Sequence, residues 1–421
     1  MKSIKAILAI MLCSATVGTQ AQNASNQVGG DISMLPVYEQ NNVAYKDQNG
    51  VTQSDVLQFF GNNGWNAERV RLFVDPYSGV THDATGVYQT LDYVKALGKR
   101  IKEHGQSFML DFHYSDTWTD PGKHALPKSW EGLTVEQLKT KIYDYTKDCL
   151  QQLVAAGATP DYIQPGNEIT YGMLWPTGHI WPGGGGQDGG TWENFTDYLE
   201  QAIKACKEVC PNAKIVIHTE MSKSSNVTNF YRQLKNYTNV SYDVIGLSYY
   251  PDYHNDLATL NSLLNTLEAL YTDKEIMIVE TGYGYKWHLN KNSYDFTSTW
   301  PLTEAGQKQF AIDLINTLNN HPKVTGLYWW YPEDNGNGVK YNDEWISWWN
   351  AALFNHDTGK PYAAFYELIK FRGVDPTGIQ TLTTQHTTPD TKHWYTLSGQ
   401  RISKPTQQGI YIHNGNKVVI K

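Results

Sequence analysis

The stretch DVIGLSYYPDYHNDLATLNSLLNTLEALYTDKEIMIVE, residues 243–280, decides the fold. It begins with a short apolar run, continues through a helical pattern over 257–271 and ends on the apolar run IMIV at 276–279. Apolar runs without polar alternation are typical of parallel strands that are covered on both faces. Two such strands joined by a helix predict a βαβ unit.

The same alternation extends over residues 29–373. We expect strands near Asp31–Ser33, Ala67–Phe73, Ser107–Phe112, Tyr162–Gly166, Lys214–His218, Val244–Ser248, Ile276–Glu280 and Gly326–Trp330. Helical patterns between them cover Gly86–His104, Thr134–Ala156, Trp192–Val209, Leu257–Tyr271 and Thr303–Asn320, among others. A set of eight strands alternating with helices predicts an α/β fold of the (β/α)8 TIM barrel type.

The two ends of the chain differ from this region. Residues 1–21, MKSIKAILAIMLCSATVGTQA, combine two lysines, an apolar run and a small-residue end, which predicts a signal peptide cleaved after Ala21. The barrel domain is expected over 22–373, and a linker rich in Thr, Gln and Pro over 374–392. Alternating residues and an Asn414-Gly415 turn predict a small β-hairpin or meander in the tail, 393–421.

Composition narrows the class of partner. The formal net charge is -8, and loss of Lys2 and Lys5 with the signal peptide makes it more negative. An acidic protein without basic runs is a poor binder of nucleic acid or anionic membranes. Outside the signal peptide, no segment is long and apolar enough to cross a membrane. The 14 Trp and 28 Tyr residues agree with a sugar partner, since pyranose rings stack on aromatic faces, although aromatic residues also fill cores.

The cysteines carry little information about function. Without Cys13, the mature chain has Cys149, Cys206 and Cys210, an odd number in helical stretches. We expect buried free thiols, with one disulfide as the alternative. No histidine near them has the spacing of a zinc ligand.

Polar residues gather where the predicted strands end. Because barrel enzymes build their sites at the carboxyl ends of the strands, these side chains are expected to share one rim. The set comprises Arg71, Asp111, His113, Asn167, Glu168, His218, Glu220, Tyr249, Glu280 and Trp329.

Two glutamates in this set have the spacing of a catalytic pair. Glu168 ends the motif Gly166-Asn167-Glu168 after the fourth strand, and Glu280 ends the seventh. The fourth and seventh strands of a closed barrel face each other across its mouth. Glycosidic bonds are usually cleaved by two carboxyl groups, one that protonates the leaving oxygen and one that attacks or activates water. The pair therefore predicts a glycoside hydrolase.

The chain resembles glycoside hydrolase family 53, the endo-β-1,4-galactanases, over almost all of residues 29–371. The matching stretches are GGDISMLP (29–36), RVRLFVDPY (69–77), LDFHYSDTWTDPGK (110–123), PKSW (127–130), YDYTKD (143–148), IQPGNEITYGMLWP (163–176), IGLSYYP (245–251), VETGY (279–283) and YWW (328–330). The resemblance implies endo-acting, retaining hydrolysis of β-1,4-galactan, the side chain of type I arabinogalactan in pectin.

The resemblance also implies roles for individual residues. Glu168 would be the general acid/base and Glu280 the nucleophile. Arg71 would hold Glu280 and keep it ionised, and Tyr249 would hydrogen-bond it.

Five further residues would bind the substrate. Asn167 would bind the sugar 2-hydroxyl, and Trp329 would form the floor under the distorted sugar. Asp111, His113 and Trp118 would line the cleft. Asp31 would brace the barrel mouth rather than touch sugar.

The remaining implications concern cofactors, oligomeric state and cellular location. We expect no cofactor and no metal, since the loop after the seventh strand has a single acid, Asp295, where some bacterial relatives carry calcium ligands. The expected protein is a bacterial monomer, secreted or held in the cell envelope. The tail resembles C-terminal segments of exported Bacteroidetes proteins, some of which direct secretion or surface attachment; the alternative is a β-extension packed on the barrel.

Two other functions stay open at this point. A mannanase or endoglucanase of the same clan would share the glutamates and differ in the cleft loops. A non-catalytic surface protein that binds glycans would ordinarily have lost one of the two glutamates.

Overall fold

The computed structural model describes residues 26–78, 88–237, 239–289, 294–337 and 348–373, and four short strands within 394–420. Contacts divide the chain into two compact units, Met1–Thr377 and Gly378–Lys421. The expected signal peptide and linker lie outside the described residues.

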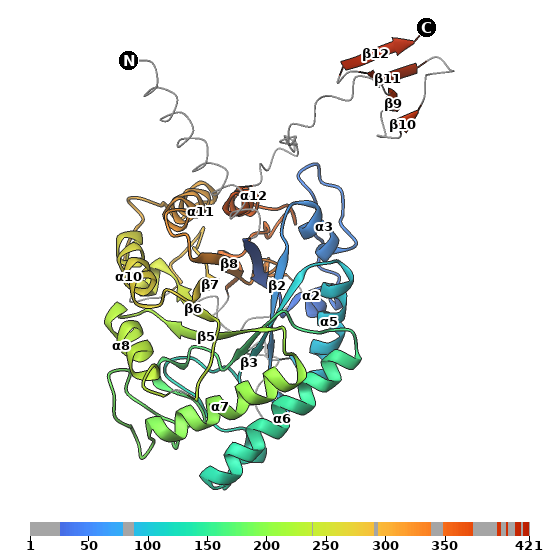
Figure 1. Ribbon diagram of the computed structural model, residues 1–421. Helices are drawn as coiled ribbons and strands as arrows, with labels where there is room; N and C mark the ends of the chain where they lie inside the picture. Colours follow the sequence, from blue (N-terminus) through green and yellow to red (C-terminus); the bar gives the residue numbers. More distant parts are fainter. Residues whose placement is uncertain are drawn as a thin grey trace, which may run out of the picture. The chain divides into compact units, whose positions relative to one another are not determined.

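The first unit is a closed barrel of parallel strands in sequential order, which confirms the predicted (β/α)8 fold (Figure 1). Its strands are β1 (Gln27–Asp31), β2 (Ala67–Leu72), β3 (Ser107–Phe112), β4 (Tyr162–Pro165), β5 (Lys214–Glu220), β6 (Val244–Tyr249), β7 (Glu275–Thr281) and β8 (Val324–Trp330).

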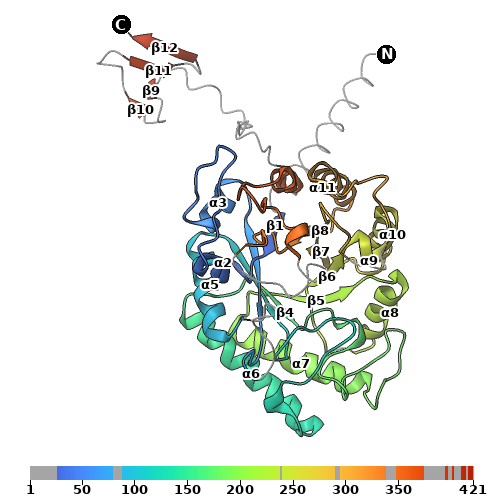
Figure 2. The ribbon, with the colours of Figure 1, turned by 180° about the vertical axis from the view of Figure 1, so that it is seen from behind.

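Helices surround the barrel, as the views from front and back show (Figures 1 and 2). They are α2 (Leu35–Gln40), α3 (Val56–Asn62), α5 (Leu91–Glu103), α6 (Val135–Ala155), α7 (Trp192–Val209), α8 (Ser224–Leu234), α9 (Pro251–His254), α10 (Leu257–Leu270), α11 (Glu304–Leu318) and α12 (Ala363–Leu368). Short 3-10 turns are η1 (Lys128–Trp130), η2 (Ile169–Tyr171), η4 (Trp348–Ala351) and η5 (Ile369–Arg372).

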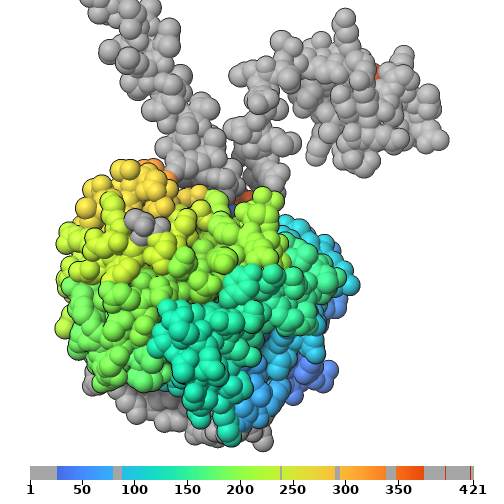
Figure 3. All heavy atoms as spheres, turned by 60° about the horizontal axis from the view of Figure 1, so that its bottom comes forward, coloured from blue at the N-terminus to red at the C-terminus, as the bar shows by residue number. Residues whose placement is uncertain are grey.

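The long helices begin at side chains that satisfy their free N–H groups. Thr134 caps α6, with Gln137 completing a capping box. Helices α6 and α7 lie side by side on the face seen in Figure 3 and are linked there by the Lys139–Asp197 ion pair at 2.7 Å. Among the described residues, no helix is long and apolar enough to cross a membrane.

Side chains along each strand point alternately into the lumen of the barrel and toward the helix layer. A buried cluster of apolar side chains from β2 to β8 fills the inside of the barrel. Its members are Ala67, Met109, Tyr162, Val216, Val244, Met277, Val279 and Tyr328. Because side chains of a strand alternate between its two faces, this cluster fixes which later residues point into the mouth.

The first strand differs from the prediction. It spans Gln27–Asp31 and pairs Gly29 with Ala67, whereas the sequence indicated a strand at Asp31–Ser33. A Cβ atom on Gly29 would lie 2.0 Å from the Ala67 carbonyl oxygen. Close approach of β2 therefore requires glycine here, and glycines in a sequence usually indicate a turn. The helix predicted from Gly86 begins at Leu91, and residues 79–87 are not described.

The second unit is a four-stranded antiparallel sheet in the order β10-β9-β11-β12. Its strands are β9 (Trp394–Thr396), β10 (Arg401–Ile402), β11 (Gly409–His413) and β12 (Asn416–Ile420). His413 pairs with Asn416, so β11 and β12 form a hairpin around the predicted Asn414-Gly415 turn.

Candidate active site

The two predicted catalytic glutamates lie at the same rim of the barrel. Glu280 is in β7 and pairs across the sheet with Ser248 of β6. The Ser248 hydroxyl donates a hydrogen bond to Glu168 Oε1 at 2.6 Å, so Glu168 lies beside the strand residue that pairs with Glu280. Residues far apart in sequence thus meet where β4, β6 and β7 end.

A β-bulge turns Glu280 toward the lumen. Ile278 pairs with Leu247, but the next pair is Glu280 with Ser248, so Val279 is an extra residue in β7. Met277 and Val279 belong to the lumen cluster, and strict alternation from them would point Glu280 at the helices. The bulge re-aims the side chain, a known use of bulges beside active sites.

Glu280 is nearly buried and held by two side chains. Its Oε1 lies 2.9 Å from Arg69 Nη2, and its Oε2 accepts a hydrogen bond from the Tyr250 hydroxyl at 3.1 Å. The exposed fraction of Glu280 is 5%, which leaves a narrow approach for a reacting atom.

Glu168 sits in a strained backbone conformation. Its φ is 47° and its ψ 48°, the left-handed region that non-glycine residues rarely adopt. Its backbone N–H donates to His218 Nδ1 at 3.2 Å, which supports the turn. Strain of this kind, about 1–3 kcal/mol, persists where surrounding contacts hold it and is common at active sites.

The two carboxyl groups differ in proton affinity. Burial, and then the charge of Glu280, raise the pKa of Glu168 well above its ordinary value. Burial also raises the pKa of Glu280, but Arg69 and the Tyr250 hydroxyl act in the opposite direction. Glu280 therefore loses its proton first, and Glu168 keeps its own, which is the division of roles that an acid and a nucleophile need.

Arg69 is the centre of the buried polar network. Its guanidinium contacts Asp31 at 2.9 Å, Asp111 at 2.7 Å and Glu280 at 2.9 Å, and it donates to Asn167 Oδ1 at 2.9 Å. All five side chains are buried or nearly so. One fixed arginine thus orients the nucleophile candidate and the asparagine beside Glu168, and Asp31 braces the mouth as predicted.

The prediction that Arg71 holds Glu280 is wrong, because Arg69 makes that contact. The Arg71 guanidinium carbon lies 4.3 Å from the ring centre of Trp118, 4.7 Å from that of Trp330 and 4.7 Å from that of Tyr331. Arg71 is thus enclosed by aromatic rings and fixes them through cation–π contacts.

The predicted contact of Tyr249 with the nucleophile is also wrong. The Tyr249 hydroxyl donates to the Asn255 carbonyl at 3.0 Å, and its ring packs on Phe310 of α11. Tyr250, the next residue, faces the lumen and binds Glu280. The alternation that runs through Val244 to Ser248 continues to Tyr250.

Trp329 does not form the floor of the site. Its indole N–H donates to the Ala351 carbonyl at 2.7 Å, and its ring packs on Phe310 in the helix layer. Trp330 is two residues along β8 from Tyr328 of the lumen cluster, so its side chain points to the same face of the strand. Its ring lies against Arg69 and Arg71.

Two residues predicted to line the cleft lie beneath it. Asp111 has an exposed fraction of 0% and accepts hydrogen bonds from Arg69 and from Gln164, the latter at 2.6 Å. His113 is buried beside it, with its Nε2 3.2 Å from Asp111. Burial lowers the pKa of His113, so the ring is neutral. Trp118 is partly exposed and stays a candidate for contact with substrate.

The residues that sequence reasoning missed are Arg69, Gln164, Ser248, Tyr250 and Trp330. The sequence does contain a signal for Tyr250 and Trp330. Residues two apart on a strand point to the same face, and both tyrosine and tryptophan continue the series of lumen-facing residues of their strands. No such signal separates Arg69 from Arg71, which share a face of β2.

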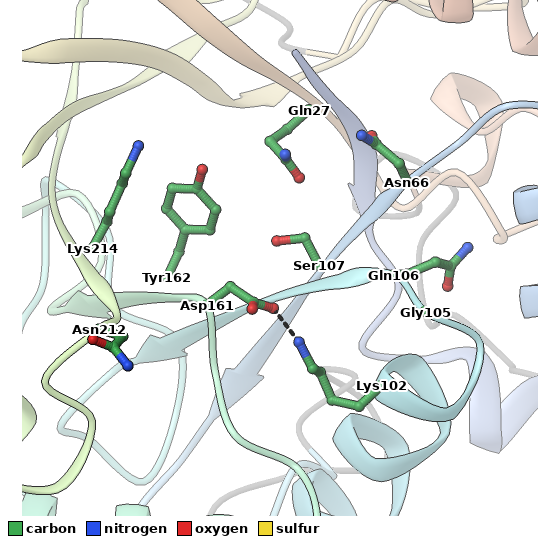
Figure 4. Close-up of a pocket in the computed structure, with 10 residues that line it drawn as sticks. All are labelled: Gln27, Asn66, Lys102, Gly105, Gln106, Ser107, Asp161, Tyr162, Asn212 and Lys214. Carbon is green, nitrogen blue, oxygen red and sulfur yellow. Dashed lines mark hydrogen bonds and ion pairs between the residues drawn. The ribbon is translucent and has the colours of Figure 1, made fainter. Parts of the chain in front are cut away.

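A pocket of about 480 Å³ opens at the opposite, amino-terminal ends of the strands (Figure 4). Gln27, Ser107, Tyr162 and Lys214 line it from the first residues of β1, β3, β4 and β5. The Lys102–Asp161 ion pair at 2.6 Å crosses one side. Neither candidate catalytic glutamate borders this pocket.

Two further observations bear on cofactors. The part of the chain that the structure describes contains no cluster of His, Cys, Asp and Glu able to hold a metal ion. Cys149, Cys206 and Cys210 are buried free thiols, as expected.

Comparisons with known proteins agree with this geometry. A model of the family described as Glycosyl hydrolase family 53 matches residues 27–366. An arabinogalactan endo-beta-1,4-galactanase of Thermothelomyces thermophilus is 33% identical over 322 residues, 72% of this chain and 88% of that protein. An endo-beta-1,4-galactanase of Bacillus subtilis is 28% identical over 353 residues, 79% of each chain. The GH53 catalytic domain of Ignisphaera aggregans superposes with a TM-score of 0.72 at 31% identity, covering 82% of this chain and 96% of that domain.

Proposed function

The chain belongs to glycosyl hydrolase family 53, and from this membership we propose that it hydrolyses internal β-1,4-galactosidic bonds of galactan with retention of configuration. The observation that carries the proposal is the pair Glu168 and Glu280. Only Glu280 of the two contacts a cation, Arg69, and the other keeps its proton.

The two steps follow from the positions of the protons. Protonated Glu168 transfers its proton to the glycosidic oxygen while the Glu280 carboxylate attacks the anomeric carbon, and the C–O bond to the leaving sugar breaks. Glu168, now a carboxylate, then takes a proton from water, and the resulting hydroxide attacks the same carbon and releases Glu280. Each step inverts the anomeric carbon.

Three side chains have the contacts expected of groups that hold the sugar. Trp330 is 7% exposed and lies against Arg69 and Arg71, so part of its aromatic ring is open to a sugar. Asn167 is fixed by Arg69 and by its own bond to Thr119, beside Glu168, where it can reach the 2-hydroxyl. Trp118 adds a partly exposed aromatic face.

The substrate is tested by release of reducing ends. We expect release from potato galactan and far less from mannan and from cellulose derivatives. Activity on mannan or cellulose instead would identify another retaining hydrolase of the same clan. A protein that binds galactan without cleaving it would mean that the carboxyl pair is inert.

The stereochemistry gives a second test. Carboxyl groups of retaining enzymes lie about 5–5.5 Å apart, too close for a water molecule between nucleophile and sugar. Galactose ends released by two inversions should first appear as the β-anomer and then mutarotate. Proton NMR of the anomeric signals in the first minutes of digestion measures this. An initial α-anomer would show that the second carboxylate activates water directly.

We propose further that the first 21 residues direct export of the chain, which is a monomer. We also propose that the C-terminal tail, 393–421, directs the protein to its final location. Deletion of residues 378–421 should leave galactan hydrolysis and the unfolding temperature of the barrel unchanged, because the first unit ends at Thr377. The same deletion should change the fraction of the cell in which the protein is found. A truncated chain that fails to fold would instead make the tail a structural part of the barrel.

A further inference from the structure

Ser248 lies at the crossing of the buried hydrogen bonds around Glu168. Its side chain is buried on β6, and its Oγ is 2.6 Å from Glu168 Oε1 and 2.8 Å from His218 Nε2. A hydroxyl has one proton to donate, so the direction of these two bonds depends on the histidine.

The neighbours of His218 fix its proton on Nε2. Its Nδ1 lies 3.2 Å from the backbone N–H of Glu168 and 3.1 Å from Gln164 Nε2, and both of these groups are donors. Asn167 Oδ1 is also 3.1 Å from Nδ1, but the backbone N–H of Glu168 can only donate, so Nδ1 must present its lone pair. Burial, and then the charge of Arg69, hold the pKa of His218 well below its ordinary value, so the ring is neutral. Nδ1 therefore accepts, and Nε2–H donates to Ser248.

The serine hydroxyl is consequently directed at Glu168. Since Ser248 Oγ accepts from His218, its own proton is free to point only to Glu168 Oε1. A carboxyl oxygen that accepts a short hydrogen bond is unfavourable as the oxygen that carries the carboxyl proton. The acidic proton of neutral Glu168 is thereby confined to Oε2.

We propose that Ser248 and His218 are positioning residues that select Oε2 of Glu168 as the oxygen that gives and takes the catalytic proton. The inference rests on the proposed function and adds to it a chain of directed hydrogen bonds from His218 through Ser248. In the first step the chain presents the proton on one oxygen, and in the second it stabilises the carboxylate that accepts a proton from water.

Other groups also act on Glu168. The carboxyl groups of Glu280 on β7, Glu220 on β5 and Asp120 in the loop after β3 all raise its pKa. The phenols of Tyr250, just before α9, and of Tyr253, within it, interact electrostatically with Glu168, and the His124 ring lies near the Glu168 backbone. Of the interactions that act on its pKa, the hydrogen bond from Ser248 is the one that favours the ionised form.

The test is the replacement Ser248→Ala. Loss of a hydrogen bond to a charged group should raise the pKa of Glu168 and move the basic limb of the kcat/KM profile on galactan upward by about one pH unit. We expect kcat to fall roughly tenfold with little change in KM, because the bond acts on the proton and not on sugar binding.

Two further variants separate this effect from packing. Ser248→Thr keeps the hydroxyl and should restore the wild-type basic limb. Thr196→Ala removes a buried hydroxyl on α7, which bonds to the Trp192 carbonyl, and should leave the profile unchanged. An unmoved basic limb in folded Ser248→Ala would overturn the inference, since a serine that only packs cannot shift it.

A readout without substrate distinguishes this inference from the proposed function. Carbon-13 NMR titration of labelled glutamate carboxyls, assigned with Glu168→Gln, reports the pKa of Glu168 directly. An upward shift in Ser248→Ala supports the hydrogen-bond chain even if galactan is not the substrate. An unchanged titration together with active wild-type enzyme overturns the chain and leaves the proposed function intact.

Discussion

Glu168→Gln should lower kcat on galactan by about 10²–10⁴-fold, because the amide can neither protonate the leaving oxygen nor activate water. A sugar is a poor leaving group and depends on the acid. An aryl galactobioside with an activated leaving group does not, so its first step should be nearly unaffected and its second step slow. The expected result is a burst of phenol release followed by slow turnover. Absence of the burst, or an equal loss of kcat/KM on both substrates, would contradict the assignment of Glu168 as the acid.

Azide provides the matched control for this prediction. In Glu168→Gln, azide needs no general base and should attack the glycosyl-enzyme, so turnover recovers and the product is a β-galactosyl azide. In Glu280→Gly, azide should occupy the space of the lost carboxylate and attack the substrate itself, giving the α-azide. The two products are separated by NMR. If the two variants gave the opposite anomers, the roles of the two glutamates would be exchanged.

The barrel could be predicted from the sequence because its strands are short apolar runs at regular intervals. The run at 276–279 has no polar alternation, and the helix before it has a clear apolar face. Glu280 could be predicted because it directly follows such a run, and Glu168 because it ends the motif Gly166-Asn167-Glu168 after the fourth strand. The rim of a barrel collects every strand end in one place, so order in the sequence was enough.

Side-chain direction was harder to predict than position in the chain. A slip of one residue moves a side chain from one face of a strand to the other. At 249–250 and at 329–330, two adjacent aromatic residues are both plausible sugar-site residues, so the sequence does not indicate which of the two points into the barrel. The β7 bulge adds a second difficulty, because it breaks the alternation at Glu280 and leaves no mark in the sequence.

Arg69 and Arg71 could not be separated by alternation, because two residues along a strand return to the same face. They differ in depth. Arg69 lies deeper in the barrel and contacts Asp31, Asp111 and Glu280. Arg71 lies among aromatic rings and reaches Asp31 at 3.6 Å. The choice between them depends on where three carboxylates from β1, β3 and β7 converge, which is a property of the closed barrel and not of any one strand.

Replacing each arginine tests this assignment and should give the second large effect. Arg69→Met leaves Asp111 and Glu280 without their arginine in a buried site and removes the closer of the two arginines at Asp31, and breaking a buried pair in this way costs about 3–5 kcal/mol. We expect urea denaturation to show a loss of that size. Loss of Arg69 also removes an interaction that lowers the pKa of Glu280. The acidic limb of the kcat/KM profile should therefore move to higher pH, since Glu280 must be ionised to attack.

Arg71→Met is the matched control, with the same change two residues away. This variant loses cation–π contacts worth about 0.5–2 kcal/mol and the 3.6 Å contact of Arg71 with Asp31, and it should keep the acidic limb in place because Arg69 still holds Glu280. If Arg69→Met does not fold, Arg69→Lys keeps the charge and loses the fork that reaches Asp31, Asp111 and Glu280 together, so the limb should still move. A shifted acidic limb in Arg71→Met with an unshifted limb in Arg69→Lys would return the orienting role to Arg71.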